Sequence, residues 1–114
     1  MPPLQFHAGQ TYLIEIPNPS NKHLFIIILE PNPKSGQTII LPIDSNNFDN
    51  APTVELKPGD HAFVKVPSFV SYPFARIVTT SYLENLINKG KAEPKEPISK
   101  VVSSKISIGS LRKL

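Results

Sequence analysis

Closely spaced prolines restrict the fold of this chain of 114 residues more than any other feature of its sequence. The chain has 13 of them, about twice the usual share, and up to residue 78 they recur at short intervals. Proline breaks a helix in its interior because it lacks an N–H group and its ring clashes with the preceding turn. Short strands joined by rigid turns tolerate such spacing, so we expect strands up to residue 78 and helix only after it.

Apolar patterns in the same region predict six short strands. Residues 11–16 alternate, with Tyr12, Ile14 and Ile16 on one face, which indicates a half-buried strand. Residues 23–30, HLFIIILE, form a continuous apolar run, the pattern of a central strand that is covered on both faces. Further strands are expected over 38–43, 53–60, 61–66 and 74–79.

The pattern then changes to a helical period. Residues 81–89 are predicted to form a helix, with Ser81 and Glu84 as a capping box and Gly90 as the residue that ends it. The segment KAEPKEP reads as a linker, and a second helix is expected over 98–106, with Ser99 as N-cap and Gly109 as a stop.

These elements predict a mainly β protein: an SH3-like barrel over about residues 9–78, followed by one or two C-terminal α-helices over about 80–110. Residues 1–114 are expected to form a single domain, because a chain of this length can bury enough surface for one core. An OB-like barrel is the alternative, although that fold usually has longer strands and an earlier helix.

Composition narrows the function. The chain has no cysteine, which excludes zinc–thiolate sites and cysteine nucleophiles, and its acidic residues are scattered, so no metal site or other cofactor is expected. No apolar run approaches the ~20 residues that span a bilayer, so we expect no membrane association and a cytoplasmic protein. Basic residues gather in the last quarter of the chain, which indicates either a nucleic-acid contact or a solvated lysine face.

The stretch GDHAFVKVPSFVSY, residues 59–72, combines polar and aromatic side chains. If 61–66 is a strand, His61, Phe63 and Lys65 share the outward face. A base could then stack on Phe63 while the cations meet phosphates. The alternative is that a C-terminal helix covers Phe63, with His61 and Lys65 flanking that contact.

An RNA-cleaving version of this face needs groups that transfer protons and groups that hold the strand. His23 and His61 are the candidates for proton transfer from a 2′-hydroxyl, with Asp60 as the carboxylate that orients the imidazole. The candidates for holding RNA are basic, aromatic or hydroxyl-bearing: Lys22, Phe63, Lys65, Ser68, Tyr72 and Arg76.

The succession GQTYLIEIP, HLFIIILEP and LKPGDHAFVKVPSFVSYPFARI resembles the PemK/MazF family of toxin–antitoxin toxins. The resemblance covers most of residues 9–110. It implies an SH3-like barrel that forms a homodimer, a metal-independent endoribonuclease activity on RNA, and an antitoxin protein that lies across the RNA groove.

One segment of the sequence differs from that family. Where its members carry a Lys/Arg-Pro element before the first long apolar strand, this chain reads SNKHLFIII, with Lys22 and His23. Either His23 and His61 perform the acid–base work, or the barrel binds without cutting. A noncatalytic SH3-like interaction module, or a phage or plasmid accessory protein, is therefore the alternative function.

Overall fold

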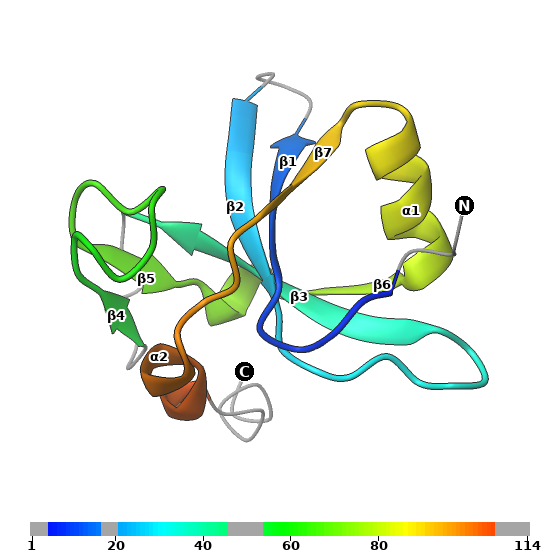
Figure 1. Ribbon diagram of the computed structural model, residues 1–114, viewed down its shortest axis with the longest axis horizontal. Helices are drawn as coiled ribbons and strands as arrows, with labels where there is room; N and C mark the ends of the chain where they lie inside the picture. Colours follow the sequence, from blue (N-terminus) through cyan, green and yellow to red (C-terminus); the bar gives the residue numbers. More distant parts are fainter. Residues whose placement is uncertain (1–4, 17–20, 46–53, 107–114) are drawn as a thin grey trace.

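The fold is a curved antiparallel sheet of seven strands, seen in a computed structural model that describes residues 5–16, 21–45 and 54–106 (Figure 1). The strands are β1 (Thr11–Ile16), β2 (Asn21–Ile27), β3 (Gln37–Asp44), β4 (Glu55–Leu56), β5 (Ser68–Val70), β6 (Arg76–Thr79) and β7 (Ala92–Lys95). The mainly β prediction is confirmed, and the strands expected over 11–16, 23–30, 38–43 and 74–79 correspond to β1, β2, β3 and β6.

Strand β3 pairs with three other strands of the sheet. One edge of β3 pairs with β2, and its other edge pairs with β6 along its first half and with β5 at its end. The main path runs β4-β5-β3-β2-β1-β7. Within the described residues no pairing joins β7 to β4 or β6, so the sheet is open there.

Each face of the sheet carries its own apolar cluster. One cluster packs Leu24 and Ile26 of β2 against the chain from β4 to Tyr72 and against the C-terminal segment. The other packs Phe25 and Ile27 against Leu83 and the N-terminal arm. Strand β2 is thus covered on both faces, as its continuous apolar run predicts.

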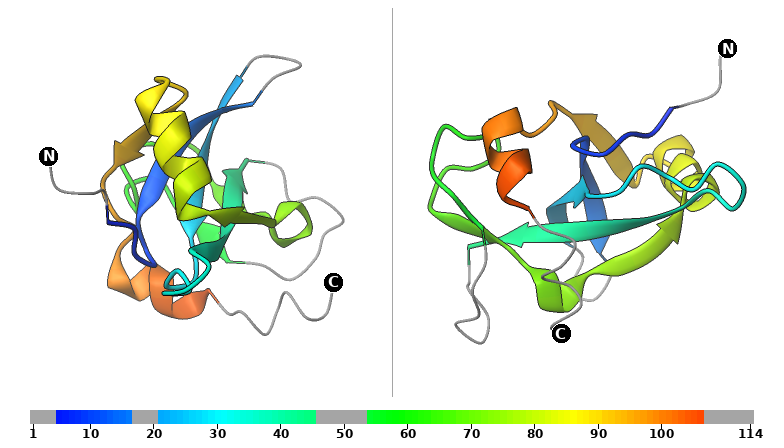
Figure 2. Two further views of the ribbon diagram at one scale, coloured as in Figure 1. Left: turned by 90° about the vertical axis from the view of Figure 1, so that its right-hand side faces the viewer. Right: turned by 90° about the horizontal axis from the view of Figure 1, so that it is seen from below.

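The main helix, α1 (Thr80–Asn88), lies on the second cluster (Figures 1 and 2). Its N-cap is Thr79, whose Oγ1 accepts a hydrogen bond from the Tyr82 N–H at 3.1 Å, so the predicted cap at Ser81 is wrong. Thr79 is still extended as the last residue of β6, the backbone geometry that an N-cap needs. Gly90 ends the helix as predicted, with a φ of 74°.

The second predicted helix is shorter than expected, since α2 covers only Lys100–Lys105. The Ser99 hydroxyl accepts from the Val102 N–H at 3.2 Å, the contact expected of an N-cap. Gly109, the predicted stop, lies outside the described residues. Neither helix in the described part of the chain is long and apolar enough to cross a membrane.

The strand expected over 53–60 is reduced to β4, and a short 3-10 helix, Tyr72–Phe74, lies before residue 78, where no helix was expected. Three further element predictions are wrong. Residues 61–66 form turns instead of a strand, residues 92–95 of the predicted linker form β7, and β5 was not expected. The sequence pattern does not predict β7 because it is an edge strand that contains Pro94. In the register with β1, the nitrogen of Pro94 points away from β1. The missing N–H of Pro94 therefore removes no hydrogen bond between the two strands.

Candidate functional site

The predicted site residues divide between the two faces of the sheet. Lys22 and His23 are consecutive on β2, and consecutive residues of a strand point to opposite faces. Lys22 lies on the face that holds the loop 57–67, where its Nζ is 3.6 Å from a carboxylate oxygen of Glu93. His23 lies on the α1 face, together with Arg76. The structure therefore does not gather the candidates into one site.

His61 is buried, with 3% of its surface exposed, so the prediction that it faces outward is wrong. Its Nδ1 accepts from the Phe63 N–H at 3.1 Å, and its Nε2 lies 2.7 Å from the Glu96 carbonyl oxygen and 3.1 Å from Thr11 Oγ1. This arrangement defines a neutral ring with the proton on Nε2. Both ring nitrogens are engaged, and His61 ties the loop 57–67 to β1 and to the segment after β7.

Asp60 closes the turn before His61. Its carboxylate accepts from the Lys57 N–H at 2.7 Å, and its own N–H donates to the Lys57 carbonyl at 2.9 Å. Gly59 takes the left-handed position of this Pro-Gly turn, with a φ of 99°. These contacts give Asp60 a role in shaping the loop.

The other candidates of the opening stretch differ in exposure. Phe63 is 45% exposed, and Lys95 Nζ lies 4.8 Å from its ring centroid, so no helix in the described part of the chain covers it. Lys65 is exposed. Ser68 and Tyr72 are buried, and the Ser68 hydroxyl donates to the Val66 carbonyl at 3.0 Å. Ser68 begins β5 and Tyr72 begins the short 3-10 helix Tyr72–Phe74, so both side chains are packed inside the protein.

A small hollow of about 160 Å³ opens on the α1 face; we call it the His23 hollow. Partly buried His23 and Asp44 line it with Arg76, brought there by β2, β3 and β6 respectively. The remaining wall consists of Ile16, Phe25, Pro42, Ser71 and Phe74. An imidazole, a carboxylate and a guanidinium around one cavity form a set that can move a proton and stabilise an anion.

Arg76 is the cation of this face. Its guanidinium lies over the Phe25 ring, 5.9 Å from the centroid. Among the described residues, no carboxylate forms an ion pair with it. A guanidinium without such a partner presents its donors to an anionic ligand, and its fork geometry suits a phosphate.

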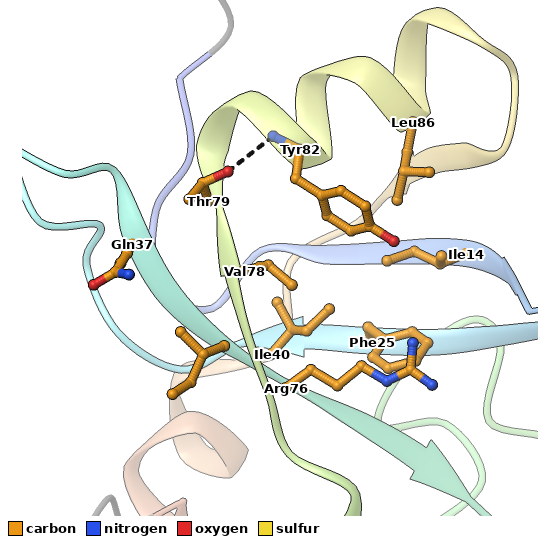
Figure 3. Close-up of a pocket in the computed structure, with 10 residues that line it drawn as sticks. Ile14, Phe25, Gln37, Ile40, Arg76, Val78, Thr79, Tyr82 and Leu86 are labelled. Atoms are coloured by element: carbon orange, nitrogen blue, oxygen red, sulfur yellow. Dashed lines mark hydrogen bonds between the residues drawn. The ribbon is translucent and has the colours of Figure 1, made fainter.

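A larger and mostly apolar hollow of about 600 Å³ adjoins the first; we call it the Tyr82 hollow (Figure 3). Phe25 and Arg76 line both hollows. The other lining residues come from β1, β3, β6 and α1: Ile14, Gln37, Ile40, Ile77, Val78, Thr79, Tyr82 and Leu86. Figure 3 shows the Tyr82 ring reaching across the hollow toward Ile14.

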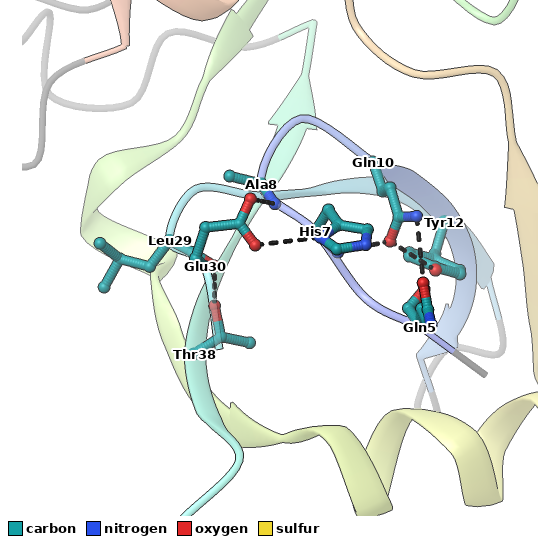
Figure 4. A network of polar contacts seen from close by, with 8 residues as sticks. All are labelled: Gln5, His7, Ala8, Gln10, Tyr12, Leu29, Glu30 and Thr38. Atoms are coloured by element: carbon teal, nitrogen blue, oxygen red, sulfur yellow. Dashed lines mark hydrogen bonds and ion pairs between the residues drawn. The ribbon is translucent and has the colours of Figure 1, made fainter. Parts of the chain in front are cut away.

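The N-terminal arm is fixed by a polar network at another edge (Figure 4). His7 Nδ1 lies 3.2 Å from a carboxylate oxygen of Glu30, and the Gln10 amide oxygen accepts from the His7 N–H and the Tyr12 hydroxyl. Burial raises the pKa of Tyr12 above its ordinary value. None of these residues lines the His23 hollow, so this network is structural support.

Sequence reasoning missed Asp44, Ser71 and Phe74. Asp44 shares a face with Ile40 and Pro42 by strand alternation, but only the pairing of β3 with β2 places it near His23. The Ser71 N–H donates to the Pro42 carbonyl at 2.9 Å, a contact between distant parts of the chain. The described residues contain no group of three or more histidines and carboxylates that could hold a metal ion.

The chain matches no family model, no curated protein and no solved structure in the three comparisons made.

Proposed function

We propose that this protein binds single-stranded RNA on the α1 face and cleaves it at the His23 hollow without a metal ion. The observation that carries the proposal is that His23, Asp44 and Arg76 line one small cavity. His23 takes the proton of a 2′-hydroxyl, which attacks the adjacent phosphorus. The bond to O5′ breaks, solvent supplies the proton for the leaving oxygen, and a 2′,3′-cyclic phosphate remains.

Arg76 stabilises the charge that develops on the phosphorane, and Asp44 orients the imidazole as it becomes positive. The aromatic rings at the two hollows, Phe74 and Tyr82, offer faces on which bases stack. This arrangement replaces the earlier assignment of His61 and Asp60, whose polar atoms are engaged within the loop 57–67.

The proposal extends to the kind of protein. An open, curved sheet with a helix after its sixth strand is compatible with a diverged SH3-like barrel of the PemK/MazF kind. On this proposal the protein acts in the cytoplasm, forms a homodimer and is neutralised by an antitoxin protein.

The test is cleavage of a labelled RNA of mixed sequence in EDTA. We expect fragments that end in a 2′,3′-cyclic phosphate, and a strand with 2′-deoxyribose throughout should stay intact. His23→Ala should slow cleavage ~100-fold or more, because it removes a proton-transfer group. His7→Ala is the matched control, an exposed histidine outside the hollow, and should cleave at the wild-type rate. Cleavage that survives His23→Ala unchanged would contradict the proposal.

A noncatalytic interaction module is the second candidate. The observation that favours it is the exposed apolar side chains beside the Tyr82 hollow, above all Ile77, which is 73% exposed. Intact RNA and no RNA binding by the wild-type chain would favour this alternative.

A further inference from the structure

The Tyr82 hollow is continuous in its walls with the proposed cleavage site. Phe25 and Arg76 line both cavities, and Figure 3 shows Arg76 extending along the Tyr82 hollow toward the Phe25 ring. A phosphate bound to this guanidinium would therefore sit at the junction of the two hollows. The nucleoside attached to that phosphate reaches the Tyr82 hollow directly.

The size and lining of the hollow suit a flat, largely apolar ring. Its volume of about 600 Å³ falls within the range of small-molecule sites, roughly 300–1,000 Å³. Isoleucine, valine, leucine and aromatic side chains form most of the wall, and polar groups are few. Among the described residues that line the hollow none is acidic and Arg76 alone is charged, so the hollow favours part of an anionic ligand.

Tyr82 is placed to stack on such a ring. Its backbone N–H is held by Thr79 Oγ1, which anchors the first turn of α1, while its side chain remains 47% exposed. The ring reaches across the hollow instead of packing into the core (Figure 3). Stacking a base on an aromatic side chain contributes ~1–3 kcal/mol, which corresponds to roughly tenfold or more in affinity.

We propose that the Tyr82 hollow is a nucleobase-binding subsite, which holds the base next to the phosphate that Arg76 binds, stacked on Tyr82. The inference rests on the proposed RNA-binding function and assigns a substrate contact to a cavity outside the cleavage site. A side chain of a protein partner is the competing occupant.

The experiment measures fluorescence anisotropy of labelled ten-nucleotide strands with the full chain in EDTA. The probes are rA, rC and rU decamers with 2′-O-methyl groups, which prevents cleavage, and an abasic strand of the same length. The variants are Tyr82→Ala, Tyr82→Phe and Arg76→Ala, with Asn85→Ala as the control on an exposed position of the same helix. Circular dichroism checks that α1 is retained.

We expect the wild-type protein to bind at least one base-bearing strand more tightly than the abasic strand. Tyr82→Ala should weaken that binding about tenfold and leave the abasic strand unaffected, since it removes stacking and no charge. Tyr82→Phe and Asn85→Ala should stay within about twofold of the wild type, because both retain the ring at position 82.

Four results would overturn the inference, and they separate it from the proposed function. Base-bearing strands that bind no better than the abasic one, or an equal loss on both strands in Tyr82→Ala, would remove the base subsite. RNA binding that needs Arg76 but is unchanged in Tyr82→Ala would also remove it, while the proposed function stands. No binding of any strand by the wild-type chain would contradict both the inference and the proposed function. It would favour a side chain of a protein partner as the occupant of the hollow.

Discussion

His61 occupies the centre of a hydrogen-bond network that a single substitution should disrupt. Removing its ring leaves the Phe63 N–H without its acceptor, takes one contact from the Glu96 carbonyl, which still accepts from the Thr11 hydroxyl, and opens a cavity beside Thr11. We expect His61→Ala to lower the free energy of unfolding by about 2–3 kcal/mol, the usual range for lost buried hydrogen bonds with lost packing. Urea denaturation measures the change.

The matched control for His61 is Lys65→Ala in the same loop. Lys65 is exposed, so this change should stay within about 0.5 kcal/mol of the wild type. A His61→Ala protein as stable as the wild type, with RNA cleavage abolished, would show that the residue is catalytic after all.

Tyr12 makes the free energy of unfolding depend on pH in the alkaline range. Burial raises its pKa in the folded chain above the ordinary tyrosine value of 10.0, so the unfolded chain releases the proton first as pH rises. The contribution of Tyr12 to the free energy of unfolding is fully present below the pKa of the unfolded chain. It declines above that pKa, until the phenol of the folded chain also ionises. Tyr12→Phe lacks this ionisation, so its stability relative to the wild type should improve between about pH 9 and pH 11. A difference in unfolding free energy that stays constant over that interval would contradict the assignment.

At the level of secondary-structure elements, the start of α1 depends on Thr79. Thr79→Ala removes the side chain that accepts from the Tyr82 N–H, and we expect a loss of about 1 kcal/mol in unfolding free energy. Ser81→Ala, at the exposed residue first predicted as the cap, should be close to neutral. Thermal unfolding of both variants measures this, and a larger loss in Ser81→Ala would reverse the assignment.

Elements whose signal is local were predictable. Alternation in 11–16 and the apolar run in 23–30 reflect burial against the sheet faces, so the sequence indicates β1 and β2 directly. The stretch 61–66 also alternates, but His61 and Val64 are buried there by turns: the Val64 N–H donates to the His61 carbonyl at 2.9 Å. Periodicity alone cannot separate these two cases.

The candidate site was predictable only in part, because strand pairing creates it. His23 and Arg76 were identified by their chemistry, but they are 53 positions apart in the sequence and meet only through the pairing of β3 with β2 and β6. Asp44 was missed for the same reason. Local patterns contain no information on which distant strands become neighbours, so the sequence grouped His23 with His61, which the fold directs to the opposite face.

At the scale of the whole molecule, we expect two chains to associate. The proposed kinship with the PemK/MazF family favours a homodimer, and the exposed side chains of Phe63 and Val66 in the loop 57–67 offer apolar surface outside the two hollows. Light scattering should give twice the chain mass of 12.6 kDa at micromolar concentration. A single-chain mass that persists at high concentration would count against the dimer.

On the proposed function, RNA binds the face of the sheet that carries Arg76, opposite the face that carries Lys65. The most direct test is RNA affinity as a function of salt concentration, measured by anisotropy for the wild type, Arg76→Ala and Lys65→Ala. Each lost phosphate contact lowers the slope of log affinity against log salt by about 0.7 for a single strand. We predict this decrease, with weaker binding, for Arg76→Ala and no change for Lys65→Ala. The reverse result would contradict the proposed RNA-binding face and place the RNA on the other face of the sheet.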